Sequence, residues 1–266
     1  MAKIFKRIFK DIQNFKTSNL HEHGIYCSFS EKNIYNSYAL IIGPEGTPYE
    51  DGFYLFKVEF PNNYPLNPPK VISLTQGNNI RFNPNLYTNG KVCVSILNTW
   101  GGPEWTSSCS LNSVLLSIQT LLNETPIHNE PGWELIEKTD LRCVNYNKLL
   151  KYSNLKIAIL DMLDKTEGPL EIFKDVMLDH LHKIEFKITQ YIDENISKDV
   201  VLKTDIYTLY IKTNFKECFS RLEDFLKIPI NKSNIEELVY KPKPTIEEPI
   251  QNSTEYIENS DIEGIE

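Results

Sequence analysis

The chain has 266 residues, of which 41% are hydrophobic and 24% are charged, as in an ordinary globular protein with a sizeable core. Its net charge of -8 argues against a general nucleic-acid binder, which normally presents a basic surface. The sequence holds no run of about 18 apolar residues, so we expect no transmembrane helix and no membrane partner.

The cysteines predict free thiols rather than a metal site. There are five of them, and none forms a C-x-x-C pair or a Cys/His cluster with zinc spacing. We therefore expect no metal and no cofactor, and a reducing compartment, either cytoplasmic or nuclear. A monomer is the default expectation for the oligomeric state. The cysteines are Cys27, Cys93, Cys109, Cys143 and Cys218.

The N-terminal segment is predicted to form an amphipathic helix. Apolar residues recur at helical spacing from Ile4 to Phe15. The first ten residues carry four bases and no acid, whereas residues 245–266 carry seven acids and no base. This asymmetry predicts a basic docking surface at one end and a solvated acidic tail at the other. The four bases are Lys3, Lys6, Arg7 and Lys10.

Four strand-like segments follow, and short loops between them favour an antiparallel meander. Each is rich in β-branched and aromatic residues and is bounded by Gly, Pro, Asn or Asp. In the third, alternation predicts that Tyr54, Phe56, Val58 and Phe60 face the core. The segments are Ile25–Phe29, Ser37–Ile42, Phe53–Phe60 and Lys70–Leu74.

Two irregular stretches come next. Four prolines within residues 60–69 exclude a regular ladder strand, because proline lacks a backbone donor. Residues 76–110 show little periodicity and contain much Asn and Gly. A structureless segment of that length inside a compact domain usually carries function.

Helical patterns dominate the rest of the chain. Ser110 is a plausible N-cap for a helix that runs to Leu122. Beyond Trp133 the pattern favours helices without strands, and Gly168-Pro169 separates the first from the second. The last residues are predicted to be a disordered acidic tail. The predicted helices are 145–163, 170–192 and 205–226, and the tail is 240–266.

Cys93 is the candidate reactive residue. A cysteine between Val92 and Val94 is most often part of a core. However, it lies in the long irregular stretch, where functional residues concentrate. The turn-forming pair Asn89-Gly90 precedes it and can fold the chain so that Asn85 returns close to the thiol.

The run from Asn83 to Leu97 resembles the active-site signature of ubiquitin-conjugating enzymes. Asn85 lies eight residues before Cys93 and Gly90 three before it, as in that family. The proline-rich loop, the 38–48 turn, Trp105 and the helix at 110–122 are also similar. The strings 99–105 and 128–132 are most similar to the large, Z-type branch.

The resemblance implies the family's α+β fold: a four-stranded antiparallel meander flanked by helices, here with an α-helical C-terminal extension. It implies a catalytic core over residues 1–164, a helical extension over 165–239 and the tail over 240–266. It also implies that Cys93 accepts ubiquitin or a ubiquitin-like modifier as a thioester and passes it to a lysine or a ligase.

Roles for other residues follow from the same resemblance. Asn85 would donate its amide to the oxyanion that forms during transfer. His128 and Glu130 lie in the loop that overhangs the cysteine and would orient or deprotonate the incoming amine. Asn83 departs from the family's usual histidine, which holds the loop, and asparagine can do the same.

The expected partners are the modifier, a ubiquitin-activating enzyme and a ubiquitin ligase. Lys3, Lys6, Arg7 and Lys10 resemble the basic face that binds the activating enzyme. Leu66 and Ser107 occupy positions of the ligase-binding loops, where many members carry an aromatic residue and a proline. Both departures put ordinary ligase docking in doubt.

The sequence leaves three alternatives to compare with this reading. One is a catalytically silent ubiquitin-binding adaptor of the same fold, although such variants lack the cysteine. A second is a cysteine hydrolase built on Cys93 and His128, but no hydrolase signature surrounds the chain's histidines. A third is a scaffold made of the C-terminal helices, which leaves the Asn83–Cys93 segment unexplained.

Overall fold

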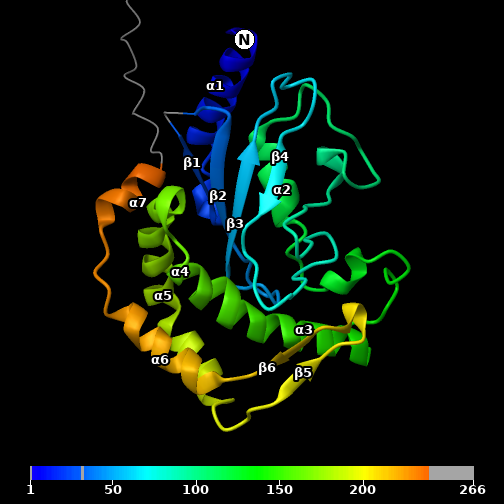
Figure 1. The fold of residues 1–266 in the computed structure, drawn as a ribbon, viewed down its shortest axis with the longest axis vertical. Coiled ribbons are helices and arrows are strands. Elements are labelled where there is room, and N and C mark those ends of the chain that lie inside the picture. The colour runs from blue at the N-terminus through cyan, green and yellow to red at the C-terminus, as the bar shows by residue number, and fades with distance from the viewer. Residues whose placement is uncertain (1, 31–32, 240–266) are drawn as a thin grey trace, which may run out of the picture.

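Four consecutive strands pair in chain order to form an antiparallel sheet. The computed structural model describes residues 2–30 and 33–239 (Figure 1). The register places Cys27 opposite Ala39, and Ala39 opposite Phe56. The predicted meander is confirmed, with bounds that differ by at most one residue. The strands are β1 (Ile25–Phe29), β2 (Asn36–Ile42), β3 (Phe53–Glu59) and β4 (Lys70–Ser73).

The predicted alternation of buried residues in β3 is only partly right. Tyr54, Phe56 and Val58 are buried, but Phe53 and Leu55 are fully buried as well. The second face is covered at this end, because helix α5 (Lys174–Asp193) places His180 edge-on against Phe53, with ring centroids 6.0 Å apart. A strand covered on both faces loses the two-residue hydrophobic period.

Helix α1 (Ala2–Lys16) packs against α2 (Leu111–Gln119). In α1, Ile8, Ile12 and Phe15 are buried, whereas two residues of the predicted apolar stripe, Phe5 and Phe9, are 43% and 57% exposed. Helix α2 ends before the predicted Leu122. Its N-cap is confirmed, because the Ser110 hydroxyl accepts from the Ser113 backbone N–H.

A continuous helical rod links the sheet to the C-terminal part of the chain. It consists of α3 (Leu141–Ser153), a π-helical segment (Asn154–Asp161) and α4 (Met162–Asp164). The rod begins four residues before the predicted 145, because Asp140 caps it by accepting from the Arg142 N–H at 2.8 Å.

Asn154 joins this rod to the sheet. Its Oδ1 accepts from the Tyr54 hydroxyl at 2.6 Å, and its Nδ2 donates to the Glu50 carbonyl at 2.8 Å. A Cβ at Gly52 would lie 1.9 Å from Asn154 Oδ1. Only glycine therefore permits this close approach.

The predicted helix over 205–226 is wrong in its first half. A two-stranded hairpin, β5 (Val201–Lys203) with β6 (Tyr210–Lys212), precedes α6 (Phe215–Leu226). The Thr213 hydroxyl closes the hairpin by bonding to Val200. A short 3-10 turn (Gly168–Phe173) leads into α5, and α7 (Lys232–Leu238) follows α6. The predicted acidic tail, 240–266, lies outside the described residues.

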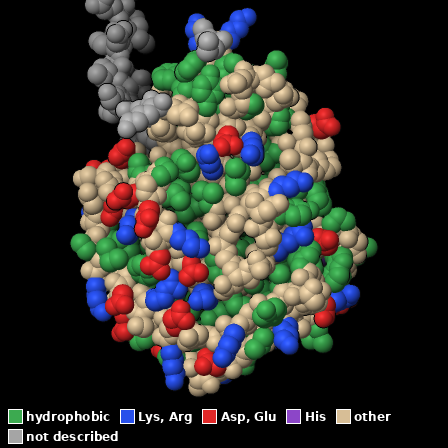
Figure 2. Space-filling model, in the orientation of Figure 1, with side chains coloured by type: hydrophobic (Ala, Val, Ile, Leu, Met, Phe, Trp, Pro, Cys, Tyr) green, Lys and Arg blue, Asp and Glu red, His purple; other side chains and the backbone are tan. Residues whose placement is uncertain are grey.

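These elements surround the sheet in layers. Figure 1 shows α3 crossing beneath the lower end of the sheet, with the β5–β6 hairpin below α3 and with α5, α6 and α7 along one side. Helix α7 reaches back to contact β1. Acidic and basic side chains are intermingled over the lower part of the face in Figure 2. The division into core and extension at residue 164 stays a prediction.

Candidate functional site

The segment around Cys93 forms a narrow hairpin. The Cys93 N–H donates to the Asn85 carbonyl at 2.8 Å, and Leu86 bridges to Val92. The tip closes at Gly90, whose φ is +87°. A side chain there would be strained by this backbone and would meet Ile72 at 2.9 Å. The turn that the sequence indicates thus brings Asn85 beside Cys93.

The Asn85 side chain contacts the backbone of the candidate nucleophile. Its Nδ2 donates to the Cys93 carbonyl at 2.7 Å. Its Oδ1 is buried and has no hydrogen-bond partner among the described residues. An amide carries two N–H donors, so one remains for a group that enters the site.

Asn83 is the centre of a buried polar network. It is fully buried, and its Nδ2 donates to the Tyr49 hydroxyl at 2.9 Å and to the Leu121 carbonyl at 2.7 Å. Its Oδ1 accepts from the Asn85 backbone N–H at 2.9 Å and from Asn129 Nδ2 at 3.2 Å. Because each donor and acceptor is paired, this network holds the entrance of the hairpin in one conformation.

Tyr49 extends that network to the segment before the hairpin. It is fully buried, and its hydroxyl donates to the Phe82 carbonyl at 2.6 Å. Burial raises the pKa of the Tyr49 phenol well above its ordinary value, and the hydrogen bond from Asn83 only partly offsets this. The phenol therefore stays protonated and remains a donor.

Residues after Cys93 are held by a second set of polar side chains. The Val94 N–H donates to Thr99 Oγ1 at 3.0 Å, and that hydroxyl lies 3.0 Å from the Val92 carbonyl. Asn98 accepts from the Trp105 N–H at 2.8 Å. Cys93 is thus fixed from both sides, and it is only 2% exposed.

The other buried cysteines are poor candidates for a nucleophile. Burial raises the thiol pKa of Cys27, of Cys143 and, to about 11, of Cys218. Because the thiolate is the reactive form, these three stay inert near neutral pH.

His128 and Glu130 form hydrogen bonds with groups other than the candidate nucleophile. His128 Nε2 lies 2.6 Å from the Ile136 carbonyl oxygen. The Glu130 carboxylate accepts from the hydroxyl of Tyr207, which lies in the β5–β6 turn. Among the described residues, neither side chain forms a hydrogen bond or an ion pair with Cys93, and their catalytic roles stay predictions.

The predicted docking residues occupy neighbouring surfaces. Lys3, Lys6 and Lys10 are exposed on α1. Arg7 differs, because it bonds Asp11 at 3.1 Å and the carbonyl oxygens of Ser107 and Cys109. It therefore braces the loop before α2 rather than standing free in solvent.

The two loop positions with a predicted ligase role lie close together. Leu66 is 75% exposed, and the Ser107 hydroxyl lies 3.3 Å from the carbonyl oxygen of Pro65. The Trp105 indole donates to the same carbonyl at 2.7 Å. The structure thus places both loops on one surface.

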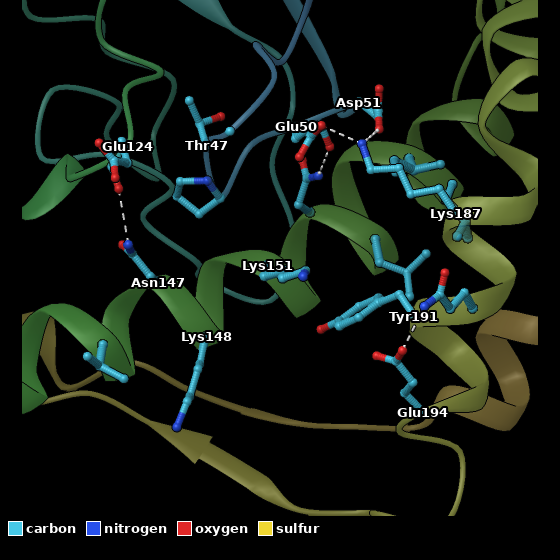
Figure 3. A pocket seen from close by; sticks show the side chains of 18 of the residues that line it. Thr47, Glu50, Asp51, Glu124, Asn147, Lys148, Lys151, Lys187, Tyr191 and Glu194 are labelled. Atoms are coloured by element: carbon cyan, nitrogen blue, oxygen red, sulfur yellow. Dashed lines mark hydrogen bonds and ion pairs between the residues drawn. The ribbon is translucent and has the colours of Figure 1, made fainter. Parts of the chain in front are cut away.

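Two cavities differ in their relation to the site. A groove of about 510 Å³ runs along the hairpin and is lined by Gly90, Lys91 and Val92. A cavity of about 670 Å³ lies between α3, α5 and the 46–51 turn, and Cys93 does not line it. Figure 3 shows Lys187 reaching Glu50 and Asp51 at its edge.

Within the described ranges 2–30 and 33–239, no group of three or more His, Cys, Asp or Glu side chains is arranged to hold a metal ion. Among the same residues, no helix is both long and apolar enough to cross a membrane.

Comparison with known proteins identifies the family. Residues 7–151 match the ubiquitin-conjugating enzyme family over more than half of the chain. This chain belongs to the ubiquitin-conjugating enzyme family. Its α+β fold, a four-stranded antiparallel sheet with flanking helices and extra C-terminal helices, is the fold of that family.

Individual relatives agree with this assignment. The chain is 52% identical over 128 residues to ubiquitin-conjugating enzyme E2 Z of Xenopus tropicalis, which covers 48% of this chain and 41% of the relative. It is 42% identical over 188 residues to probable ubiquitin-conjugating enzyme protein 17 of Caenorhabditis elegans, which covers 66% of this chain and 25% of the relative. The aligned region thus spans less than half the length of either relative.

A solved structure is also similar. It is a putative ubiquitin conjugating enzyme from Plasmodium yoelii, with 26% identity and a TM-score of 0.47, and the match covers 59% of this chain and 96% of that one.

Several residues of the site carried no usable signal in the sequence. Tyr49 and Asn129 bond Asn83 from 34 and 46 positions away, and Tyr207 bonds Glu130 from 77 positions away. Thr99 lies closer, within the string that carries the resemblance, but nothing in its surroundings indicates that its hydroxyl bonds the backbone on both sides of Cys93.

Proposed function

We propose that this family member accepts ubiquitin or a ubiquitin-like modifier as a thioester on Cys93 and transfers it to a lysine or to a ligase. The observation that carries the proposal is the pairing of Cys93 with Asn85 across the hairpin. It places an amide donor on the backbone of the cysteine, in a segment that buried polar groups hold in place.

The chemistry proceeds by two acyl transfers. The Cys93 thiolate attacks the thioester carbonyl that the activating enzyme presents, so a new C–S bond forms and the activating enzyme's thiolate leaves. An amine then attacks the carbonyl on Cys93. A C–N bond forms, the Cys93 thiolate leaves, and the amine's extra proton passes to a base or to water.

Asn85 is the residue that we expect to lower the second barrier. Each attack turns the carbonyl oxygen into an oxyanion. The Asn85 N–H that is not bound to the Cys93 carbonyl can donate to that oxyanion. Donors fixed before the reaction stabilise such charge without the cost of reorganising solvent.

Partners are proposed on the same basis. The exposed lysines Lys3, Lys6 and Lys10 of α1 would meet the activating enzyme, and Leu66 with Ser107 would meet a ligase. Arg7 would contribute indirectly, because its bonds to Asp11 and to the loop before α2 fix the orientation of α1.

A charging assay tests the proposal. The full chain is incubated with ATP, ubiquitin and one activating enzyme at a time, and is then run on gels with and without reductant. We expect a ubiquitin-sized shift that reductant removes and that Cys93→Ala abolishes. Cys109→Ala is the matched control, because this cysteine is partly exposed and lies outside the hairpin, so it should charge normally.

The low exposure of Cys93 favours one second candidate, a silent adaptor that binds ubiquitin without chemistry. A folded chain that binds ubiquitin but never charges with any activating enzyme would support the adaptor and overturn the thioester mechanism.

A further inference from the structure

The turn between β5 and β6 contacts the segment that leads into the active-site hairpin. Figure 1 shows this turn reaching from beneath α3 toward the loop that follows α2. Tyr207 lies at its apex, far in sequence from every catalytic candidate. The extension therefore reaches the site directly, and not only through the rod that begins with α3.

Tyr207 and Tyr87 hold a guanidinium between them. Arg81 lies over the ring of Tyr87, 3.9 Å from its centroid, and over the ring of Tyr207, 4.1 Å from its centroid. One Arg81 nitrogen also donates to the Pro84 carbonyl at 2.5 Å. Among the described residues Arg81 has no carboxylate within ion-pair distance, so its charge is met by the two aromatic faces and the Pro84 carbonyl.

The phenol of Tyr207 makes a second link. Its hydroxyl donates to the Glu130 carboxylate. Burial, followed by this hydrogen bond, raises the pKa of the Tyr207 phenol well above its ordinary value, so it remains a donor. Tyr146 supports the same place, because its hydroxyl donates to the Arg81 carbonyl at 2.8 Å.

The backbone of the turn is unusual where these contacts occur. Tyr207 has φ +57° and Thr208 has φ +50°. Residues with side chains seldom adopt this left-handed region, and two in succession persist only where surrounding contacts enforce them. Such strain is typical of segments that place a functional side chain.

We propose that Tyr207 is a positioning residue: it holds Arg81, and through Arg81 the Pro84-Asn85 backbone, so that the Asn85 amide faces the thioester on Cys93. The inference rests on the proposed function. It makes the C-terminal extension part of the catalytic unit and gives Glu130 the task of anchoring Tyr207.

Variants of the full chain test this role. Tyr207→Leu removes the aromatic face and the hydroxyl, whereas Tyr207→Phe keeps the ring over Arg81. Tyr210→Leu is the matched control, because Tyr210 lies on the same hairpin and is 70% exposed. Each variant is charged with ubiquitin, and discharge of the purified thioester to free lysine is followed as lysine concentration increases.

We expect Tyr207→Leu to lower the maximal discharge rate about tenfold, with the lysine concentration for half-maximal rate unchanged. Tyr207→Phe should lose no more than about threefold, because the ring-to-guanidinium contact survives. Equal rates for Tyr207→Leu and Tyr210→Leu would overturn the inference while leaving the thioester mechanism intact.

Two further measurements keep the test decisive. If Tyr207→Leu does not fold, Arg81→Lys replaces it, since lysine keeps the charge but loses the planar group. A maximal rate equal to wild type would then overturn the inference. If the wild-type chain never charges, alkylation of Cys93 by iodoacetamide is compared between Tyr207→Leu and Tyr210→Leu. Faster alkylation in Tyr207→Leu would support the positioning role of Tyr207, and rates that are equal or slower would overturn it.

Discussion

The central sheet and the Cys93 hairpin are both buried, but they are held in opposite ways. In the sheet, backbone groups pair with each other, and side chains such as Leu40 and Phe56 contribute apolar packing. In the hairpin, the buried side chains of Asn83 and Asn85 bond the backbone directly. The sheet therefore depends on side-chain volume, whereas the hairpin depends on which atoms donate and which accept.

The largest effect is expected on the rate of ubiquitin discharge when the side-chain amide of Asn85 is removed. We expect Asn85→Ala to slow discharge of ubiquitin from Cys93 to free lysine by about 100- to 1000-fold, because an oxyanion donor is lost. Single-turnover assays of the purified thioester measure this rate. Thr88→Ala, at the exposed tip of the same hairpin, is the control and should stay close to wild type. Matching rates for the two variants would remove Asn85 from the mechanism.

The next largest effect is expected when a buried hydrogen-bond donor of the hairpin is replaced by an acceptor of nearly the same shape. Asn83→Asp replaces the Nδ2 donor with an oxygen that faces the Tyr49 hydroxyl and the Leu121 carbonyl. We expect a loss of about 3 kcal/mol in the free energy of unfolding. Equilibrium denaturation in urea at neutral pH measures it.

A substitution in the sheet that keeps the side-chain volume should cost less stability than the change of donor in the hairpin. Leu55 is fully buried in β3, and Leu55→Met should cost about 1 kcal/mol, because the apolar volume is nearly kept. The same urea titration applies. A cost equal to that of Asn83→Asp would show that the two regions do not differ in the way described.

The smallest effect concerns the charged contact between the 46–51 turn and α5. Burial tends to raise the pKa of Asp51, but hydrogen bonds from His180 at 3.0 Å and Lys187 at 2.7 Å outweigh it, so the pKa lies below its ordinary value. The resulting stabilisation is present above the unfolded pKa of about 4 and is lost as pH falls through the lower folded value.

We expect this contribution to be about 0.5 kcal/mol. Urea titrations of wild type and Asp51→Asn should differ near neutral pH and converge in acid. Curves that stay parallel down to about pH 3 would contradict the assignment.

The sequence predicts the sheet well because its signals are local. Alternating apolar residues and turn-forming pairs lie within each strand or beside it, and the Asn89-Gly90 turn likewise predicts that Asn85 meets Cys93. The β5–β6 hairpin escaped prediction because strands of three residues are too short to show a period, and α6 follows directly with a strong helical pattern. The Tyr49 and Tyr207 contacts depend on tertiary folding, which no local pattern encodes.

Asn154 sets a limit on where this protein can be divided. The match to the family ends at residue 151, yet the acceptor for the buried Tyr54 hydroxyl lies three residues later, on the rod that leads into the extension. A chain shortened to residue 151 would leave that hydroxyl without its partner, at a cost of about 1–3 kcal/mol. The Tyr54 hydroxyl would be a buried donor without an acceptor in such a fragment. The segment that can be expressed alone is therefore longer than the segment that sequence similarity outlines.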